Sequence, residues 1–99
     1  MTVDVFRFEF DQSVPLAEAE MTLQLSMIAL EGLVGQARVR LDAAYHLDAA
    51  RRAIIVDGTT AIGAALVRIF TNLALREFGD DAFVVRRAHV APAGEGRAA

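Results

Sequence analysis

The amino-acid sequence predicts an α+β fold in which four strands and two helices form two layers. Residues 3–10 alternate apolar and polar side chains with the period of two that is typical of a half-buried strand. Residues 16–34 and 61–78 instead repeat apolar side chains at steps of three and four, as amphipathic helices do. Together with three further strand patterns, the order of elements along 99 residues is β-α-β-β-α-β.

The first strand and the first helix follow directly from these patterns. In residues 3–10, three phenylalanines share one face of the predicted strand. A turn at residues 11–13 follows, and we expect Ser13 to cap a helix whose first turn holds Pro15. Gly35 is expected to end this helix. Its core stripe is predicted to comprise Leu16, Ala19, Leu23, Met27, Leu30 and Val34.

The second and third strands are predicted in the middle of the chain. Residues 37–47 show the clearest alternation in the sequence and predict a long strand with one buried face. Residues 48–51 are expected to form a hairpin turn, and residues 52–57 a short central strand. The polar face of the long strand would carry Arg38, Arg40, Asp42, Ala44 and His46.

The last helix and strand complete the predicted order. Thr59 or Thr60 is expected to cap the helix, and Gly79 to end it. Residues 82–90 supply the fourth strand. The core stripe of the helix is predicted to hold Ile62, Leu66, Ile69 and Leu73, with Phe70 at its edge.

This succession of elements is that of a ferredoxin-like βαββαβ sandwich, with an antiparallel sheet ordered 4-1-3-2 and both helices on one face. Residues 1–90 are predicted to form this single domain. Residues 91–99 contain a proline and two glycines and are predicted to form a flexible C-terminal tail. The predicted core comprises Phe6, Phe8, Leu23, Met27, Leu30, Val39, Leu41, Ile54, Val56, Ile62, Leu66, Ile69, Leu73 and Val84.

The composition excludes several kinds of chemistry. The chain has no cysteine and all ten of its basic residues are arginine, so it offers no thiol nucleophile, disulfide or lysine Schiff base. A net charge of −3 argues against a dedicated nucleic-acid-binding protein. The sequence shows no signal-peptide pattern and no apolar stretch long enough to span a membrane, so we expect a cytoplasmic protein.

Two patterns that resemble functional motifs have simpler explanations. Residues 58–63 have the spacing of a phosphate-binding loop, but Ala64 and Ala65 stand where that motif needs Lys and Ser or Thr. We therefore expect the second glycine to permit close packing of the helix on the sheet. His46 and His89 are expected at opposite ends of the sheet, so the sequence predicts no metal site and no cofactor.

Two surfaces are candidates for contact with a second copy or another protein. Met21, Leu25 and Ile28 recur at helical spacing opposite the core stripe, and a two-layer domain would leave them exposed. The open face of the sheet is the second candidate, with Val3 and Val5 on its apolar part. Both surfaces suit a homo-oligomer or a protein partner.

The leading hypothesis is a small non-enzymatic domain that self-associates or binds a protein partner, acting as a structural or regulatory subunit. An alternative is a module that binds an anion or single-stranded nucleic acid through Arg7, Arg38 and Arg40 on the open sheet face. A small enzyme with a shallow site is a third possibility, although the sequence identifies no catalytic residue.

Overall fold

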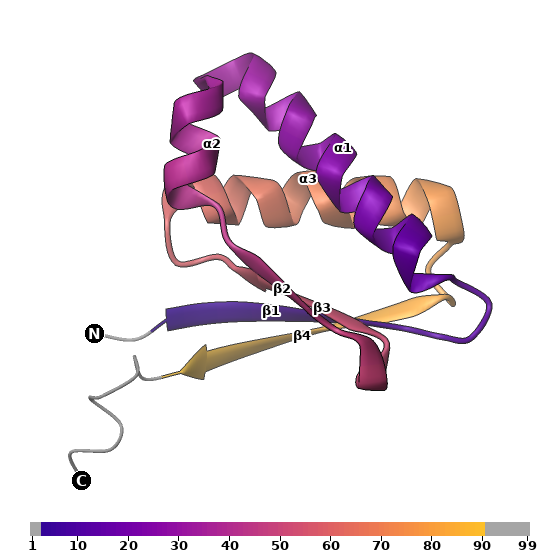
Figure 1. Ribbon diagram of the computed structural model, residues 1–99. Helices are drawn as coiled ribbons and strands as arrows, with labels where there is room; N and C mark the ends of the chain where they lie inside the picture. Colours follow the sequence, from indigo (N-terminus) through magenta and orange to yellow (C-terminus); the bar gives the residue numbers. More distant parts are fainter. Residues whose placement is uncertain (1–2, 91–99) are drawn as a thin grey trace, which may run out of the picture.

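Four strands form one antiparallel sheet, and the helices all lie over one of its faces (Figure 1). The computed structural model describes residues 3–90; the predicted tail, residues 91–99, lies outside them. The sheet order β2-β3-β1-β4 is the predicted order of a ferredoxin-like sandwich. The elements are β1 (Val3–Phe10), α1 (Leu16–Val34), α2 (Gln36–Asp42), β2 (Tyr45–Asp48), the 3-10 turn η1 (Ala49–Arg51), β3 (Ala53–Asp57), α3 (Ala61–Phe78) and β4 (Phe83–Val90).

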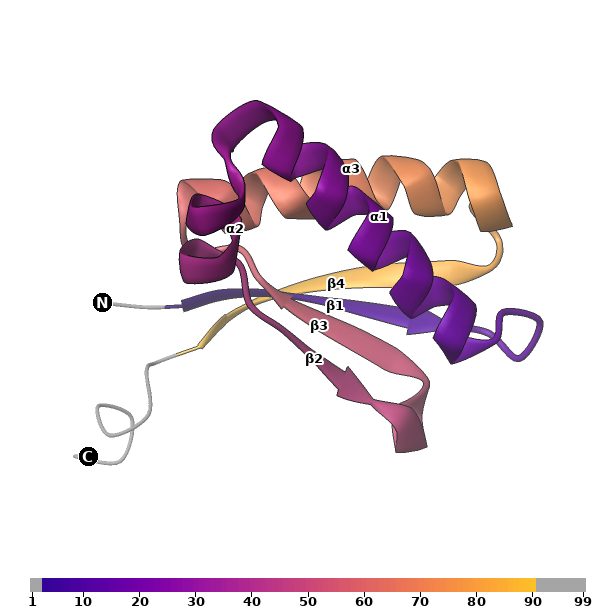
Figure 2. The same ribbon diagram turned by 45° about the horizontal axis from the view of Figure 1, so that its top comes forward.

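The core lies between the sheet and the helix layer (Figure 2). β1 is central, and it pairs antiparallel with β3 on one side and with β4 on the other. Its phenylalanines face the helices, as predicted. Phe8 is fully buried and its ring meets the ring of Phe70 edge to face, with centroids 4.7 Å apart. Phe70 therefore lies at the centre of the core, not at the edge of the α3 stripe as predicted.

The helix ends follow local rules, with one exception. The Thr60 hydroxyl oxygen accepts a hydrogen bond from the backbone N–H of Gly63 at 2.9 Å and so caps α3. Gly35, which follows α1, has a φ of +94°, a conformation that favours glycine. The predicted cap at Ser13 is wrong, because α1 begins after Pro15 without a side-chain cap and Ser13 hydrogen-bonds Asp11 instead.

The predicted strand at residues 37–47 is the main error in the fold. Residues 36–42 form α2, and only residues 45–48 join the sheet as β2. The partner strand β3 has five residues, so it can pair with no more than a short segment. The Gln, Ala, Arg and Leu residues before β2 favour a helix, and α2 packs Val39, which is fully buried, into the core.

Most of the predicted core is confirmed, with two exceptions. Leu41 is 82% exposed because it points away from the core on α2, and Val84 is 54% exposed on the open face of β4. Four predicted core residues, Phe6, Met27, Ile69 and Leu73, are partly buried. Within residues 3–90, no helix is long and apolar enough to cross a bilayer. The fully or nearly fully buried members of the predicted core are Phe8, Leu23, Leu30, Val39, Ile54, Val56, Ile62 and Leu66.

Candidate functional site

The outer side of α1 carries a row of exposed aliphatic side chains, which we call the outer stripe: Met21, Leu25 and Ile28. Their exposed fractions are 62%, 55% and 60%, so the exposure predicted from the sequence is present. The three residues follow one another at steps of four and three, which places them on one side of the helix. No element of the described chain covers them.

The exposed face of α1 is unusual along its whole length. Nine of its residues are exposed, and only Glu18 among them is charged. Its buried side instead includes Thr22 and Ser26, whose hydroxyls donate to the backbone oxygens of Glu18 and Thr22 at 3.2 and 2.8 Å. The exposed side of α1 is therefore mainly apolar, whereas a helix that faces water normally has a polar exposed side. The other eight exposed residues, of which Gln24 alone is polar, are Ala17, Met21, Gln24, Leu25, Ile28, Ala29, Gly32 and Leu33.

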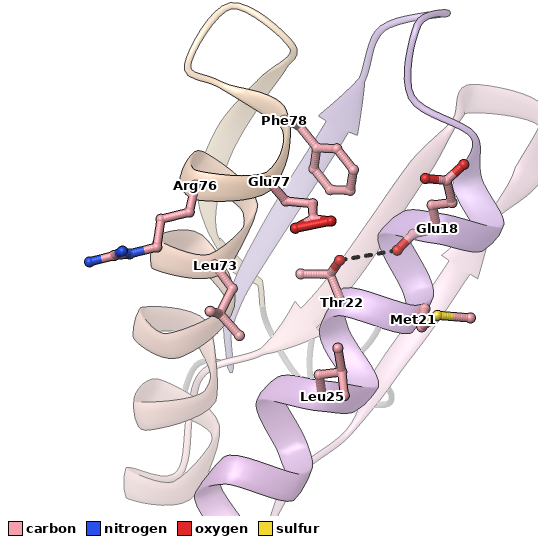
Figure 3. Close-up of a pocket in the computed structure, with 8 residues that line it drawn as sticks. All are labelled: Glu18, Met21, Thr22, Leu25, Leu73, Arg76, Glu77 and Phe78. Atoms are coloured by element: carbon pink, nitrogen blue, oxygen red, sulfur yellow. Dashed lines mark hydrogen bonds between the residues drawn. The ribbon is translucent and has the colours of Figure 1, made fainter.

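A groove of about 290 Å³ lies beside the outer stripe, between α1 and the C-terminal part of α3. Figure 3 shows Glu77 and Phe78 of α3 extending toward α1, while Arg76 points away from the groove. The sequence did not predict this groove, because it depends on how α1 and α3 pack against each other. Its lining residues are Glu18, Met21, Thr22, Leu25, Leu73, Arg76, Glu77 and Phe78.

The open face of the sheet is dominated by paired charges. Arg7 on β1 donates through Nε to Glu9 at 2.8 Å and through Nη2 to Asp48 at 3.2 Å. Arg86 on β4 donates through Nε to the second oxygen of Glu9 at 3.0 Å. Because Arg7 and Arg86 lie directly opposite each other in the sheet, the Glu9 carboxylate separates two like charges.

These contacts shift the ionisation of both partners. The pKa of the Glu9 carboxyl lies below its usual value of 4.5, because hydrogen bonds from Arg7 and then Arg86 favour the carboxylate. The hydrogen bonds to Glu9 and Asp48 raise the pKa of Arg7. Arg7 is thus engaged within the sheet, in competition with any external anion.

The predicted anion site at Arg7, Arg38 and Arg40 is not assembled. Arg38 and Arg40 lie on α2 in the helix layer and not on the open sheet face. Residues two apart on a helix point in different directions, so these two arginines do not present paired guanidinium groups to one ligand. The prediction depended on the long strand that the structure replaces with α2.

The predicted apolar part of the open sheet face is small. Val5 is partly buried and lines a shallow hollow of about 210 Å³ with Tyr45, Ile55 and Asp57 among its neighbours. The backbone of Val3 pairs with Val90, and its side chain lies outside the described part of the structure. Val5 is therefore less exposed than each of the three residues of the outer stripe.

Comparisons with protein-family models, with curated proteins and with solved structures found no match. Among the described residues, no group of three or more His, Cys, Asp or Glu side chains is arranged to hold a metal ion. At the turn that resembles a phosphate loop, a Cβ on Gly63 would lie 2.1 Å from the backbone oxygen of Asp57. Gly63 therefore permits the close packing expected from the sequence.

Replacing Glu9 with glutamine is expected to weaken the acid dependence of stability. A carboxyl whose pKa is lowered by folding adds stability above its usual pKa, and this contribution is lost as the pH falls through the folded-state value. Wild type should therefore exceed Glu9→Gln in stability at neutral pH, and the difference should shrink below pH 4.5. Denaturant midpoints measured from neutral pH down to about pH 3 test this expectation.

Asp80→Asn is the control, because Asp80 is exposed after α3 and takes part in none of the ion pairs found in the described chain. Its difference from wild type should be small at neutral pH. A constant difference between wild type and Glu9→Gln across this pH range would contradict the role assigned to the Glu9 carboxylate.

Proposed function

We propose that this chain is a self-associating domain and that the outer stripe of α1 forms a contact between copies. The observation that carries the proposal is the exposure of Met21, Leu25 and Ile28 on a helix face whose single charge is Glu18. Burying this face against another protein removes apolar surface from water, which is the main driving force for association.

A second copy of the chain fits this surface better than a lipid bilayer does. Helices that lie on membranes combine an apolar face with flanking Lys or Arg residues that attract anionic lipids. The exposed face of α1 has no basic residue. Glu18 and Glu77 line the adjoining groove, and Arg76 extends outward from its edge, so two copies related by a two-fold axis can bring opposite charges together.

The area required for a dimer also defines the extent of the contact. Stable interfaces bury about 800 Å² on each partner, which is more than three aliphatic side chains supply. Leu33, which is 80% exposed, extends the apolar face toward the end of α1. The groove offers space for side chains of the partner. The proposed contact therefore combines the outer stripe, Leu33 and the groove between α1 and α3.

Leu25→Asp is expected to lower the mass of the protein in solution. Wild type should show a weight-average mass above the 10.7 kDa of the monomer, and this mass should rise with concentration. An aspartate at the centre of the outer stripe would bury an unpaired charge in the contact, which is costly. Sedimentation velocity or light scattering across micromolar concentrations measures the difference.

Gln24→Asp is the control, because it places the same charge at the neighbouring exposed position of α1. It should retain a mass closer to that of wild type than Leu25→Asp does. A monomeric wild type across this concentration range would overturn the proposal. Equal masses for wild type and Leu25→Asp would show that the outer stripe is not the contact.

A further inference from the structure

The β4 strand forms a long edge of the sheet. All eight of its residues pair with β1, and no other strand within the described chain pairs with its outer side. Val85 faces the helix layer, since it lies opposite Phe8, yet it is 38% exposed. Val84 faces the open side and is 54% exposed. The edge thus exposes valine on both faces.

The arginines of β4 are paired with side chains of β1. Exposed edge strands commonly carry charges or proline that prevent pairing with another chain. Here the Arg86 guanidinium is held by Glu9, and the Arg87 guanidinium is held by Asp4 at 3.1 Å and lies over the ring of Phe6. All three of these partners belong to β1, so both arginines are paired with the neighbouring strand and not with each other, although their side chains stay 68% and 56% exposed.

We propose that β4 pairs antiparallel with β4 of a second copy, with Val85 on the two-fold axis. The pairing joins two four-stranded sheets into one sheet of eight strands, with both helix layers on the same side. A two-fold axis normal to the sheet relates the two antiparallel strands, and the residue on the axis lies directly opposite its own copy. Residues that lie opposite each other in a sheet point to the same face.

The charges on β4 disfavour an axis at either of its arginines. An axis at Arg86 or at Arg87 places two arginines directly opposite each other, which is destabilising. An axis at Val85 pairs valine with valine, Val84 with Arg86, and Phe83 with Arg87, so no like charges are opposed. An axis at Ala88 offers a smaller side chain with a lower preference for strands.

A second copy is also the partner that covers the β4 edge without exposing another one. The other edge strand, β2, has only four residues, and a β2-to-β4 contact would leave further edges open. Pairing β4 with itself uses the same strand from both copies, so neither copy keeps an open β4 edge. The remaining alternative is residues 91–99 of the same chain, which contain Pro92, Gly94 and Gly96, residue types depleted in strands.

Cysteine cross-linking tests this register directly, because the chain has no cysteine of its own. In the proposed dimer the Cα atoms of the two Val85 residues lie about 4.5–5.5 Å apart, within the range of a disulfide. A Val85→Cys variant should therefore form a disulfide-linked dimer under mild oxidation. We expect the Val85→Cys dimer to form at least about tenfold faster than the dimer of Asn72→Cys, a control at an exposed position on α3.

Val84→Cys is the matched control. Val84 is the more exposed valine, so accessibility alone would make it the faster site. In the proposed register, however, the two Val84 residues are offset along the strands by about 7 Å, which separates their Cα atoms beyond the reach of a disulfide. Val84→Cys should therefore cross-link no faster than Asn72→Cys, and circular dichroism shows whether each variant is folded.

Three outcomes would overturn the proposal. Val85→Cys could cross-link no faster than Asn72→Cys, which would show that the edge is not paired. Ala88→Cys could be the fastest, which would place the axis elsewhere. Val85→Cys could cross-link only after residues 91–99 are deleted, which would show that this segment covers the edge. Repeating the measurement with Leu25→Asp separates this contact from the outer stripe, since cross-linking through β4 should survive that change.

Discussion

Replacing Leu66 with alanine is expected to lower the free energy of unfolding by about 2–5 kcal/mol. Leu66 is fully buried on α3 and belongs to the main core cluster. The substitution removes buried methyl groups and leaves a cavity that the surrounding side chains fill only in part. For a small domain this loss is a large fraction of a total stability of about 5–15 kcal/mol. Urea denaturation followed by circular dichroism measures it.

Leu41→Ala is the control for Leu66→Ala, since it is the same substitution at a position that is 82% exposed. Its effect should stay within about 0.5 kcal/mol of wild type, as is usual for surface positions. The sequence places both leucines in the core, so this pair of variants also tests the replacement of the predicted strand by α2. Equal losses for the two variants would contradict the structure at α2.

Gly63→Ala is expected to destabilise the domain by about 1–3 kcal/mol or more, although alanine is the better helix former. The added Cβ would lie 2.1 Å from the backbone oxygen of Asp57 and 3.2 Å from the Thr60 hydroxyl oxygen. The nearest obstacle is main chain, so relief requires α3 to move away from the end of β3. Such a movement would also disturb the cap that Thr60 provides.

Gly32→Ala should have the opposite sign. Gly32 lies in α1, and a Cβ added there has no atom within 4 Å. The helix preference of alanine should then raise the stability by about 0.5–1 kcal/mol. Thermal or urea unfolding of the two glycine variants beside wild type measures both effects. A stabilising Gly63→Ala would show that the β3–α3 junction is looser than the structure indicates.

The sequence predicted most of the fold because local pattern and tertiary role agree in most elements. The alternation in β1 matches a strand that is covered on one face, and the turns before and after α3 carry Thr60 and Gly79 where a helix begins and ends. The order of the strands then followed from the short connections and the handedness of crossovers. These features depend on neighbouring residues and not on distant contacts.

The segment before β2 could not be assigned from alternation alone. Ala37, Val39 and Leu41 alternate with polar residues as a strand would, yet Val39 is buried and Leu41 is exposed. The deciding constraint is the length of β3, which leaves no partner for an eleven-residue strand. That constraint involves two segments, so a pattern within one of them does not reveal it.

The candidate surfaces also differ in whether one segment or two segments determine them. The outer stripe could be predicted, since it follows from helical spacing within α1 alone. The groove could not, because Leu73 and Phe78 come from α3 and meet α1 only in the folded chain. The ion pairs of the open sheet face likewise depend on distant contacts, because the registers of three strands bring Asp48 of β2 close to Arg7 of β1.

Because β1 lies inside the sheet, between β3 and β4, it cannot pair with either neighbour until the ribosome has synthesised them. β1 is synthesised before both of its partners, β3 and β4, which begin only at Ala53 and Phe83. Until both emerge, its phenylalanines have no sheet to join, so the nascent chain exposes an aromatic, aggregation-prone segment throughout its synthesis. Neither half of the chain can complete its own core, because β1 of the first half pairs with β3 and β4 of the second half. We therefore expect the domain to fold only after β4 has been synthesised. The most extensive contacts between elements join β1 to β4 and to β3, which are distant in the sequence, so folding should be slow for a domain of this size.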